Sequence, residues 1–195
     1  MIAQLQLAID YFGYLFLNEI PCKCWVAGGA VRDYFSLGYI TTDIDIYFPS
    51  DEEFQKGKIW FIDNGGEIKF ENERLMVIYY KKHKFELIKM FFESPQQTID
   101  QFDFTVCCGA ISKDSVFFHN TFFIDLAKKR LVVNNLPYPL STLQRLQKYI
   151  KKGFTICNGG LLEIAKAIQK LDLDNPSINH IEKYPAGTPK FVRLD

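Results

Sequence analysis

The stretch CWVAGGAVRDYFSLGYITTDIDIYF, residues 24–48, decides the fold. It joins a short apolar run, a diglycine, a helix-length segment and an Asp-Ile-Asp triplet. The apolar run 24–27 predicts a buried strand, Gly28 and Gly29 predict a turn, and the segment after them predicts a helix. Residues 43–48 predict a second strand. The order strand, glycine turn, helix, strand indicates a mixed α/β architecture.

The Asp-Ile-Asp triplet predicts a metal site. Alternate residues of a strand share a face, so Asp43 and Asp45 aim two carboxylates at one place while Ile44 and Ile46 point into the core. Two carboxylates that close repel each other and resist ionising, and a divalent cation relieves the repulsion. Mg²⁺ is commonly held by one or two carboxylates together with substrate phosphates. We therefore expect magnesium here, with two ions, which can activate an attacking oxygen and neutralise a leaving pyrophosphate.

The glycine turn predicts a phosphate site. Glycines allow backbone N–H groups to approach phosphates, and the N-terminus of the following helix favours anions. Arg32 lies in the first turn of that helix, within reach of phosphate oxygens. Taken singly, Gly28 and Gly29 could form an ordinary turn, and Arg32 and Asp33 could be a surface pair. Their order, followed within eighteen residues by Asp45, favours a site for a metal-bound nucleoside triphosphate.

The segments GGAVRD and DID resemble the head domain of tRNA CCA-adding enzymes and bacterial poly(A) polymerases, within the nucleotidyltransferase superfamily of DNA polymerase beta. The family signature is G-G-x-V-R-D followed by D-x-D. The resemblance implies an α/β (α+β) polymerase-beta-like head with a mixed sheet, in which the two aspartates bind catalytic magnesium and the glycine segment binds the nucleotide, often ATP. The matching residues are Gly28, Gly29, Val31, Arg32, Asp33, Asp43 and Asp45.

Two later segments resemble the same family more weakly. KFELIKMFF looks like the strand whose glutamate faces the aspartates, which makes Glu86 the candidate third catalytic carboxylate; the alternative is an ordinary solvated strand residue. QFDFTVCCGAI resembles the segment R-R-D-F-T-I-N-A, which grips the sugar and phosphates of the nucleotide. Asp103 matches and is expected to bind nucleotide, but Gln101 and Phe102 replace the two arginines. That departure puts nucleotide affinity or choice in question.

The chain is expected to divide into a nucleotidyltransferase head (1–140), a short helical neck-like appendage (141–175) and an extended C-terminal tail (176–195). The segment PLSTLQRLQKYIKKGF resembles the family's neck helix. The further family domains that hold tRNA and read the nucleotide are not expected within 195 residues. Uncharged residues stand where the neck usually carries arginines, namely Ser141, Gln144 and Gln147.

Composition excludes a strong global attraction to nucleic acid, because 23 basic and 23 acidic side chains cancel. RNA binding would need local basic clusters, of which 81–84, 128–130 and 148–152 are candidates; solvated surfaces are the simpler explanation of each. No run reaches the ~18 apolar residues of a membrane span, and the N-terminus lacks the basic region of a signal peptide. Five cysteines, an odd number, favour reduced thiols in a cytoplasmic protein.

We therefore predict a magnesium-dependent nucleotidyltransferase that moves a nucleoside monophosphate from a triphosphate to a hydroxyl. By family resemblance, an RNA 3′ end, perhaps tRNA-like, is the first choice of acceptor. The same transfer onto a protein or a small molecule, as in toxin-like or drug-modifying enzymes, is an alternative. A non-catalytic nucleotide- or RNA-binding module is a third hypothesis, which the intact pair Asp43 and Asp45 opposes. The nucleotide base and the oligomeric state are left open.

Overall fold

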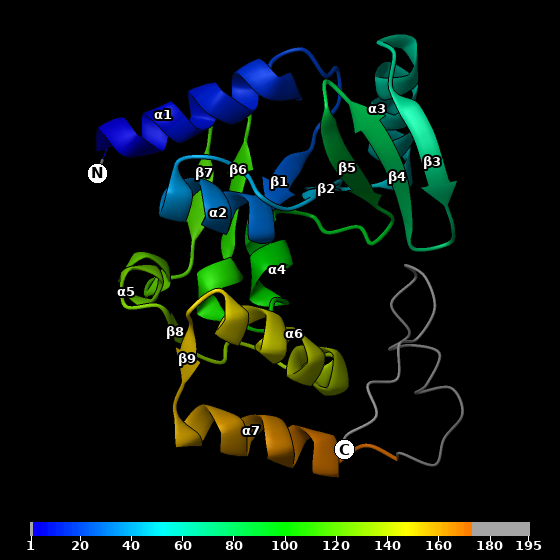
Figure 1. Ribbon diagram of the computed structural model, residues 1–195. Helices are drawn as coiled ribbons and strands as arrows, with labels where there is room; N and C mark the ends of the chain where they lie inside the picture. The colour runs from blue at the N-terminus through cyan, green and yellow to red at the C-terminus, as the bar shows by residue number, and fades with distance from the viewer. Residues whose placement is uncertain (1, 173–195) are drawn as a thin grey trace.

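The computed structural model describes residues 2–172 and is built around a seven-stranded sheet (Figure 1). The strand order is β3-β4-β5-β2-β1-β6-β7. β2 and β5 are parallel, and the other neighbouring pairs are antiparallel. The predicted mixed sheet is confirmed. The strands are β1 (Trp25–Ala27), β2 (Ile44–Tyr47), β3 (Glu67–Glu71), β4 (Leu75–Tyr80), β5 (His83–Ile88), β6 (Gly109–Ser112) and β7 (Val116–Phe118).

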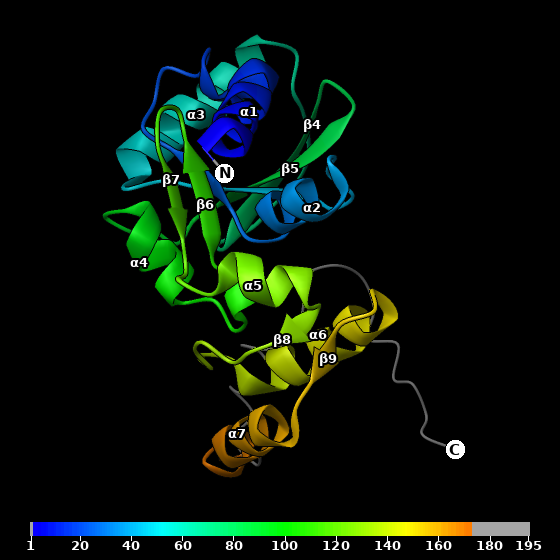
Figure 2. The same ribbon diagram turned by 90° about the vertical axis from the view of Figure 1, so that its left-hand side faces the viewer.

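Helices cover the sheet and extend beyond one end of it. α1 and α3 lie at one end of the molecule, and α6 and α7 lie at the other, as Figure 2 shows. A short parallel pair, β8 (Arg130–Leu131) and β9 (Thr155–Ile156), joins the segment after α5 to the segment between α6 and α7. The helices are α1 (Ile2–Phe12), α2 (Gly29–Leu37), α3 (Asp51–Asp63), α4 (Pro95–Asp100), α5 (Phe122–Ala127), α6 (Pro139–Lys151) and α7 (Asn158–Gln169), with a π-helical turn η1 (Gly13–Leu17) and a 3₁₀ turn η2 (Thr105–Cys107).

The core between the first helices and the sheet is aromatic. The ring of Phe85, on β5, lies 5.3 Å from that of Phe16 and 5.0 Å from that of Phe61, measured between centroids. All three side chains are fully buried. α3 begins after Ser50, because the Ser50 hydroxyl accepts a hydrogen bond from the Glu53 N–H at 3.3 Å and caps the helix. This packing fixes the sheet on which the predicted carboxylates stand.

Two glycines set the path of the chain around α2. Gly28 has φ +82°, a backbone conformation that favours glycine, and its N–H donates to the Gly109 carbonyl at 3.0 Å. Gly38 ends the helix with φ +82°, and its N–H donates to the Tyr34 carbonyl at 2.8 Å. The chain is thereby turned back so that Asp43 arrives at the start of β2, close to the turn from which the helix began.

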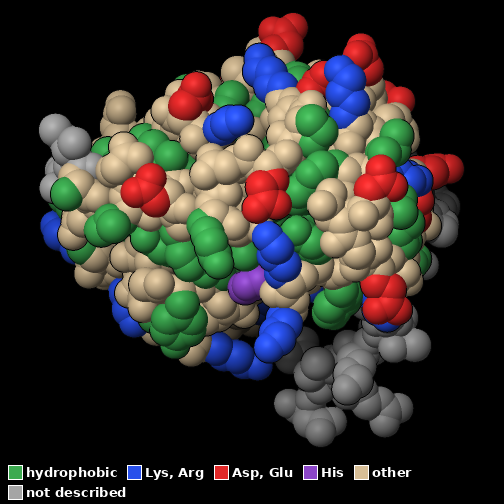
Figure 3. Space-filling view, turned by 90° about the horizontal axis from the view of Figure 1, so that it is seen from above, with side chains coloured by type: hydrophobic (Ala, Val, Ile, Leu, Met, Phe, Trp, Pro, Cys, Tyr) green, Lys and Arg blue, Asp and Glu red, His purple; other side chains and the backbone are tan. Residues whose placement is uncertain are grey.

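The surface carries mixed charges. Seen from above, acidic, basic and hydrophobic side chains are interspersed, and neither sign of charge covers the visible face (Figure 3). All five cysteines are free thiols, as predicted. Within residues 2–172, no helix combines the length and the apolar character needed to cross a membrane.

The predicted neck-like helices share the core of the head. α6 begins at Pro139, and the ring of Tyr149 packs edge-on against Phe104 at 5.4 Å and against Phe154 at 5.7 Å. Leu146, Tyr149 and Phe154 belong to the same buried cluster as the aromatic rings under the sheet. The boundary predicted at residue 140 stays a prediction, and the predicted tail, 176–195, lies outside the described residues.

Replacing Phe61 by alanine should destabilise the fold by about 3–5 kcal/mol, because the cavity lies between α3 and β5 and cannot collapse easily. The neighbouring residue Ile62 provides a matched control, since its side chain is 42% exposed on the same helix. Ile62→Ala should cost about 0.5 kcal/mol or less. Urea unfolding followed by circular dichroism measures both variants, and equal losses would contradict this account of the core.

Candidate functional site

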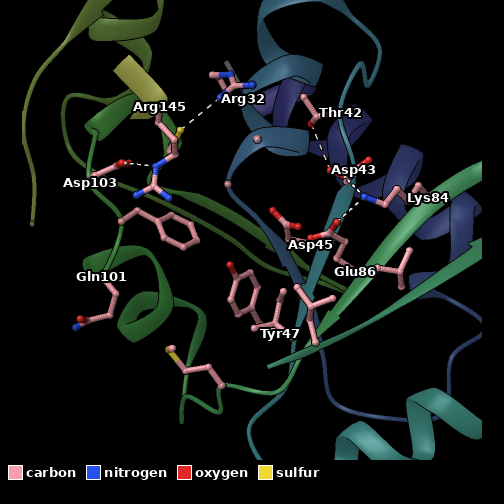
Figure 4. A pocket seen from close by; sticks show the side chains of 18 of the residues that line it. Arg32, Thr42, Asp43, Asp45, Tyr47, Lys84, Glu86, Gln101, Asp103 and Arg145 are labelled. Carbon is pink, nitrogen blue, oxygen red and sulfur yellow. Dashed lines mark hydrogen bonds and ion pairs between the residues drawn. The ribbon is translucent and has the colours of Figure 1, made fainter. Parts of the chain in front are cut away.

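A pocket of about 1290 Å³ opens between the sheet and α6 (Figure 4). One wall is formed by carboxylates at the junction of β2 and β5. The opposite wall is formed by cationic side chains of α2 and α6. The glycine turn before α2 lies between them, and Figure 4 shows Arg32, Arg145 and Asp103 facing Asp43, Asp45 and Glu86 across the cavity.

The structure brings the three predicted carboxylates together. Asp45 on β2 and Glu86 on β5 are directly paired in the parallel ladder, and Asp43 immediately precedes β2. The Lys84 ammonium joins two of them, donating to Asp43 Oδ2 at 2.6 Å and to Glu86 Oε1 at 2.6 Å. The geometric expectation for Glu86, that it faces the aspartates from a neighbouring strand, therefore agrees with the structure. Metal binding and catalysis by these residues stay predictions.

Asp45 carries the most strongly perturbed carboxylate of the cluster. Although the residue keeps some exposed surface, its carboxyl group lies deep in the pocket. Burial, and then the negative charges of Glu86 and Asp43, raise the pKa of Asp45 to about 8, against the opposing effect of Lys84 and Arg32. The positive charges of Lys84 and Arg32 therefore do not fully compensate the burial of Asp45 and the negative charges of Glu86 and Asp43.

The three carboxylates fit a divalent cation once the Lys84 ammonium moves away from Asp43 and Glu86. Three carboxylates and one ammonium leave two negative charges when all are ionised, which one divalent ion would balance. Oxygen ligands are those that Mg²⁺ prefers. Within the described part of the chain, no three His, Cys, Asp or Glu side chains are already arranged to hold a metal. Lys84 gives a physical reason, because its ammonium occupies oxygens of Asp43 and Glu86.

The glycine turn approaches Asp45 closely. A Cβ atom at Gly28 would lie 3.9 Å from Asp45 Oδ2, and one at Gly29 would lie 3.2 Å from Thr42 Oγ1. α2 begins at Gly29 with a glycine N-cap, which brings no capping side chain to its first N–H groups. A helix start of this kind favours an anion. The turn thus offers an anion cradle next to the carboxylates.

Arg32 lines the pocket but is held firmly by Asp33. Its Nε and Nη2 donate to Asp33 Oδ1 at 2.8 and 2.6 Å, and its Nη1 donates to Tyr149 Oη at 3.2 Å. Asp33 does not line the pocket; its other oxygen accepts hydrogen bonds from Thr41 Oγ1 and, at 3.4 Å, from Lys152 Nζ. The structure therefore places Asp33 behind Arg32, where it orients the guanidinium.

Asp103 lines the pocket and anchors a cation that the sequence analysis missed. Its Oδ2 accepts from Arg145 Nε at 2.7 Å, and Oδ1 accepts from the Phe104 N–H at 3.0 Å. Lys148 of α6 and Lys152, which follows the end of α6, also line the pocket. The resemblance to the neck helix drew attention only to Ser141, Gln144 and Gln147, where the family's arginines are lost, and not to Arg145. The detectable signal was the spacing of three and then four residues between these basic side chains, which puts them on one helix face.

Lys84 is the second residue whose place the sequence analysis missed. It was assigned to the basic cluster 81–84, a candidate for contact with a phosphate backbone. In the structure it faces the carboxylates, and burial, which lowers its pKa, is outweighed by the hydrogen bonds to Asp43 and Glu86, which raise it. The signal was strand alternation, since residues 84 and 86 of one strand must share a face.

The sequence matches a protein family and a phage protein. A family model described as "Gabija anti-defense 2 family protein" matches residues 6–129. The protein "Gabija anti-defense 2" of Bacillus phage SPbetaL7 is 28% identical over 153 residues, which cover 76% of this chain and 38% of that protein.

Solved structures share the fold. The Thermotoga maritima CCA-adding enzyme complexed with tRNA matches with a TM-score of 0.61 and 18% identity, over 87% of this chain and 42% of that one. A CCA-adding enzyme in complex with CTP gives a TM-score of 0.61 and 18% identity, over 83% and 43%. The predicted nucleotidyltransferase head fold is confirmed. The chain spans less than half the length of each of these proteins.

The raised pKa of Asp45 should make stability fall with pH when no metal is present. Folded Asp45 titrates at about 8, and an unfolded aspartate at about 3.9. Folding therefore takes up a proton between these values, and stability falls by up to about 1.4 kcal/mol per pH unit. Asp45→Asn removes this slope and should gain up to about 4 kcal/mol relative to the parent between pH 5 and pH 8. Urea unfolding in EDTA measures the difference; parallel pH profiles would contradict it.

Removing the Lys84 ammonium should expose the repulsion within the cluster. Lys84→Met is expected to lose about 1–2 kcal/mol of stability without metal, because Asp43 and Glu86 lose their shared partner. Added Mg²⁺ should then raise the melting temperature of this variant more than that of the parent. Lys81→Met, on the same hairpin but paired only loosely with Glu19 at 3.8 Å, is the control. An unchanged Mg²⁺ response in Lys84→Met would contradict a cation site here.

Proposed function

Because this chain belongs to the Gabija anti-defense 2 family, we propose that it uses its nucleotidyltransferase fold in an anti-defense reaction. The reaction is a magnesium-dependent transfer of a nucleoside monophosphate from a triphosphate to a hydroxyl. The observation that carries the proposal is the meeting of Asp43, Asp45 and Glu86 in one pocket. Carboxylates concentrated in this way are costly unless a cation is to be bound.

The nucleotide is proposed to lie between the two walls. Its triphosphate would follow the glycine turn, because Gly28 and Gly29 line the pocket and the start of a helix favours an anion. The cationic wall would balance its charge, and each anchored cation is oriented by a buried acid: Arg32 by Asp33, and Arg145 by Asp103. In this proposal Asp33 and Asp103 act on the nucleotide through their arginines. Lys148 and Lys152 add positive charge from the same helix, in place of the arginines missing at 101 and 102.

The chemistry is a substitution at the α-phosphorus. Asp43 and Asp45 would hold Mg²⁺, which when bound neutralises the phosphate oxygens and the leaving pyrophosphate. The acceptor oxygen forms a bond to the α-phosphorus, and the bond from that phosphorus to the bridging oxygen of the β-phosphate breaks. Glu86 faces the acceptor side and would take the proton of the hydroxyl or share the metal. Lys84 must leave Asp43 and Glu86 before either role is possible.

The acceptor decides which biological process is affected. The resemblance to CCA-adding enzymes favours an RNA 3′ end, with tRNA as the first candidate. The name of the phage relative favours a component of the Gabija defence, either a nucleic acid or a protein. A non-catalytic binding module would leave the three-carboxylate cluster without a purpose, so we place it last.

The test is transfer of label from each α-³²P nucleoside triphosphate, with Mg²⁺, into a lysate of cells that carry Gabija. We expect one triphosphate to label one class of acceptor. The double variant Asp43→Ala, Asp45→Ala should lower the rate on the order of 10³-fold or more, since the metal ligands are lost. Asp51→Ala is the matched control, because this aspartate is exposed in the first turn of α3.

Two results would reject the proposal. One is label transfer by the double variant at the rate of the parent. The other is no transfer by the parent with any triphosphate, together with nucleotide binding in Mg²⁺ that the double variant retains in full. The second result would instead establish the binding module.

A further inference from the structure

The pocket continues past Glu86 onto an apolar surface. This surface, here named the apolar shelf, is formed by strands β3 to β5 and the residues just after β5. Several of its side chains are large and open to solvent: Phe70 is 42% exposed, Tyr79 44% and Met90 47%. The shelf consists of Phe70, Leu75, Val77, Tyr79, Ile88 and Met90.

Strand register puts the shelf directly beside the carboxylates. Asp45 pairs with Glu86, Glu86 pairs with Val77, and Val77 pairs with Phe70, so these four residues form one row across the sheet. Adjacent strands are about 4.8 Å apart, which places Val77 about 5 Å and Phe70 about 10 Å beyond Glu86. The next row pairs Leu75 with Ile88. A group resting on the shelf would therefore reach Glu86 from the side opposite the cationic wall.

The charges near the shelf do not suit a phosphate backbone. The two lysines that line the pocket from these strands are already paired: Lys69 with Glu67, and Lys84 with Asp43 and Glu86. Proteins that hold nucleic acid contact its phosphates chiefly through Lys and Arg. Here both lysines are matched by carboxylates, so among the described residues this side of the pocket offers no unpaired lysine to a phosphate backbone.

We propose that the apolar shelf is the acceptor site, and that the acceptor is a serine, threonine or tyrosine hydroxyl of a protein segment with apolar neighbours. This inference rests on the proposed function and names its substrate class. Apolar side chains of the acceptor would cover the exposed rings of Phe70 and Tyr79, and removal of that surface from water would supply the binding. Concave pockets that bury apolar groups beside a few polar ones are the usual form of a binding site.

The product follows from the same substitution. The side-chain oxygen of the acceptor bonds to the α-phosphorus, its proton passes to Glu86, and pyrophosphate leaves with the electron pair of the broken P–O bond. The acceptor protein then carries a nucleoside monophosphate in phosphodiester linkage. No oxidant or further reactant is needed.

The first experiment compares shelf variants of the full chain in the labelled lysate. For the parent, we expect label that resists ribonuclease and disappears with protease. Phe70→Ala, Tyr79→Ala together should lower this transfer at least tenfold while binding of the magnesium nucleotide stays within twofold. Ile68→Ala is the matched control and should transfer at the parental rate, because Ile68 is equally exposed on β3 but pairs with the core residue Ile78 and does not line the pocket.

A second variant separates a protein acceptor from a nucleic acid. Phe70→Lys, Tyr79→Lys should reduce transfer to an apolar protein segment at least tenfold, whereas added cations would maintain or increase transfer to RNA. Both positions are open to solvent, so circular dichroism and the melting temperature should match the parent. These measurements ensure that a loss of transfer is not a loss of fold.

The outcomes distinguish the shelf from the reaction itself. If label enters ribonuclease-sensitive material or a small molecule, or if both shelf variants label protein at the parental rate, nucleotidyl transfer stands and the shelf proposal is overturned. If the parent transfers nothing from any triphosphate, the proposed function and the shelf fall together. Protease-sensitive label that both shelf variants lose, with nucleotide binding retained, supports the protein acceptor.

Discussion

Repulsion among three carboxylates is the constraint on which the rest of this protein depends. The parallel pairing of β2 with β5 forces Asp45 and Glu86 side by side, and Asp43 is added at the end of the same strand. Lys84 relieves part of the repulsion from within, two residues before Glu86 on the same face. The remaining imbalance falls on Asp45. A fold that accepts such a cost at one point must stabilise the site by packing elsewhere, and the aromatic core under β5 provides that packing.

The opposite wall shows how a family pattern can change while its electrostatics are kept. The nucleotide-gripping arginines of related enzymes are replaced by Gln101 and Phe102, and both replacements still line the pocket. Positive charge reaches the pocket from α6 instead. Arg145 is fixed by Asp103, the one charged residue of that segment that matches the family. Comparison of the motif alone indicates that two positive charges are lost here. The structure shows that α6 supplies positive charge to the pocket instead.

Local chemistry made much of the fold and the acidic wall predictable. The triplet around Ile44 and the diglycine each have a short-range physical reason, and each lies where it was expected. The interplay of Lys84 with the carboxylates and of Arg145 with Asp103 was not predicted. Both depend on contacts between residues far apart in sequence. Lys84 and Asp43 are 41 residues apart, and Arg145 and Asp103 are 42 residues apart. The pattern of a single sequence predicts on which face of a helix or strand a side chain lies. It does not predict which other element will contact that face.

Tyr149 gives the pocket a further property. Its ring stacks beneath the Arg32 guanidinium, 5.3 Å from ring centroid to carbon, and its hydroxyl meets the Cys107 thiol at 2.6 Å while its edges pack on the core. Tyr149 of α6 thereby connects this helix to α2 through Arg32. α2 and α6 cannot separate without breaking the buried aromatic contacts of Tyr149. The cationic side of the pocket and the start of α2 therefore belong to one packed core rather than to two separately mobile parts.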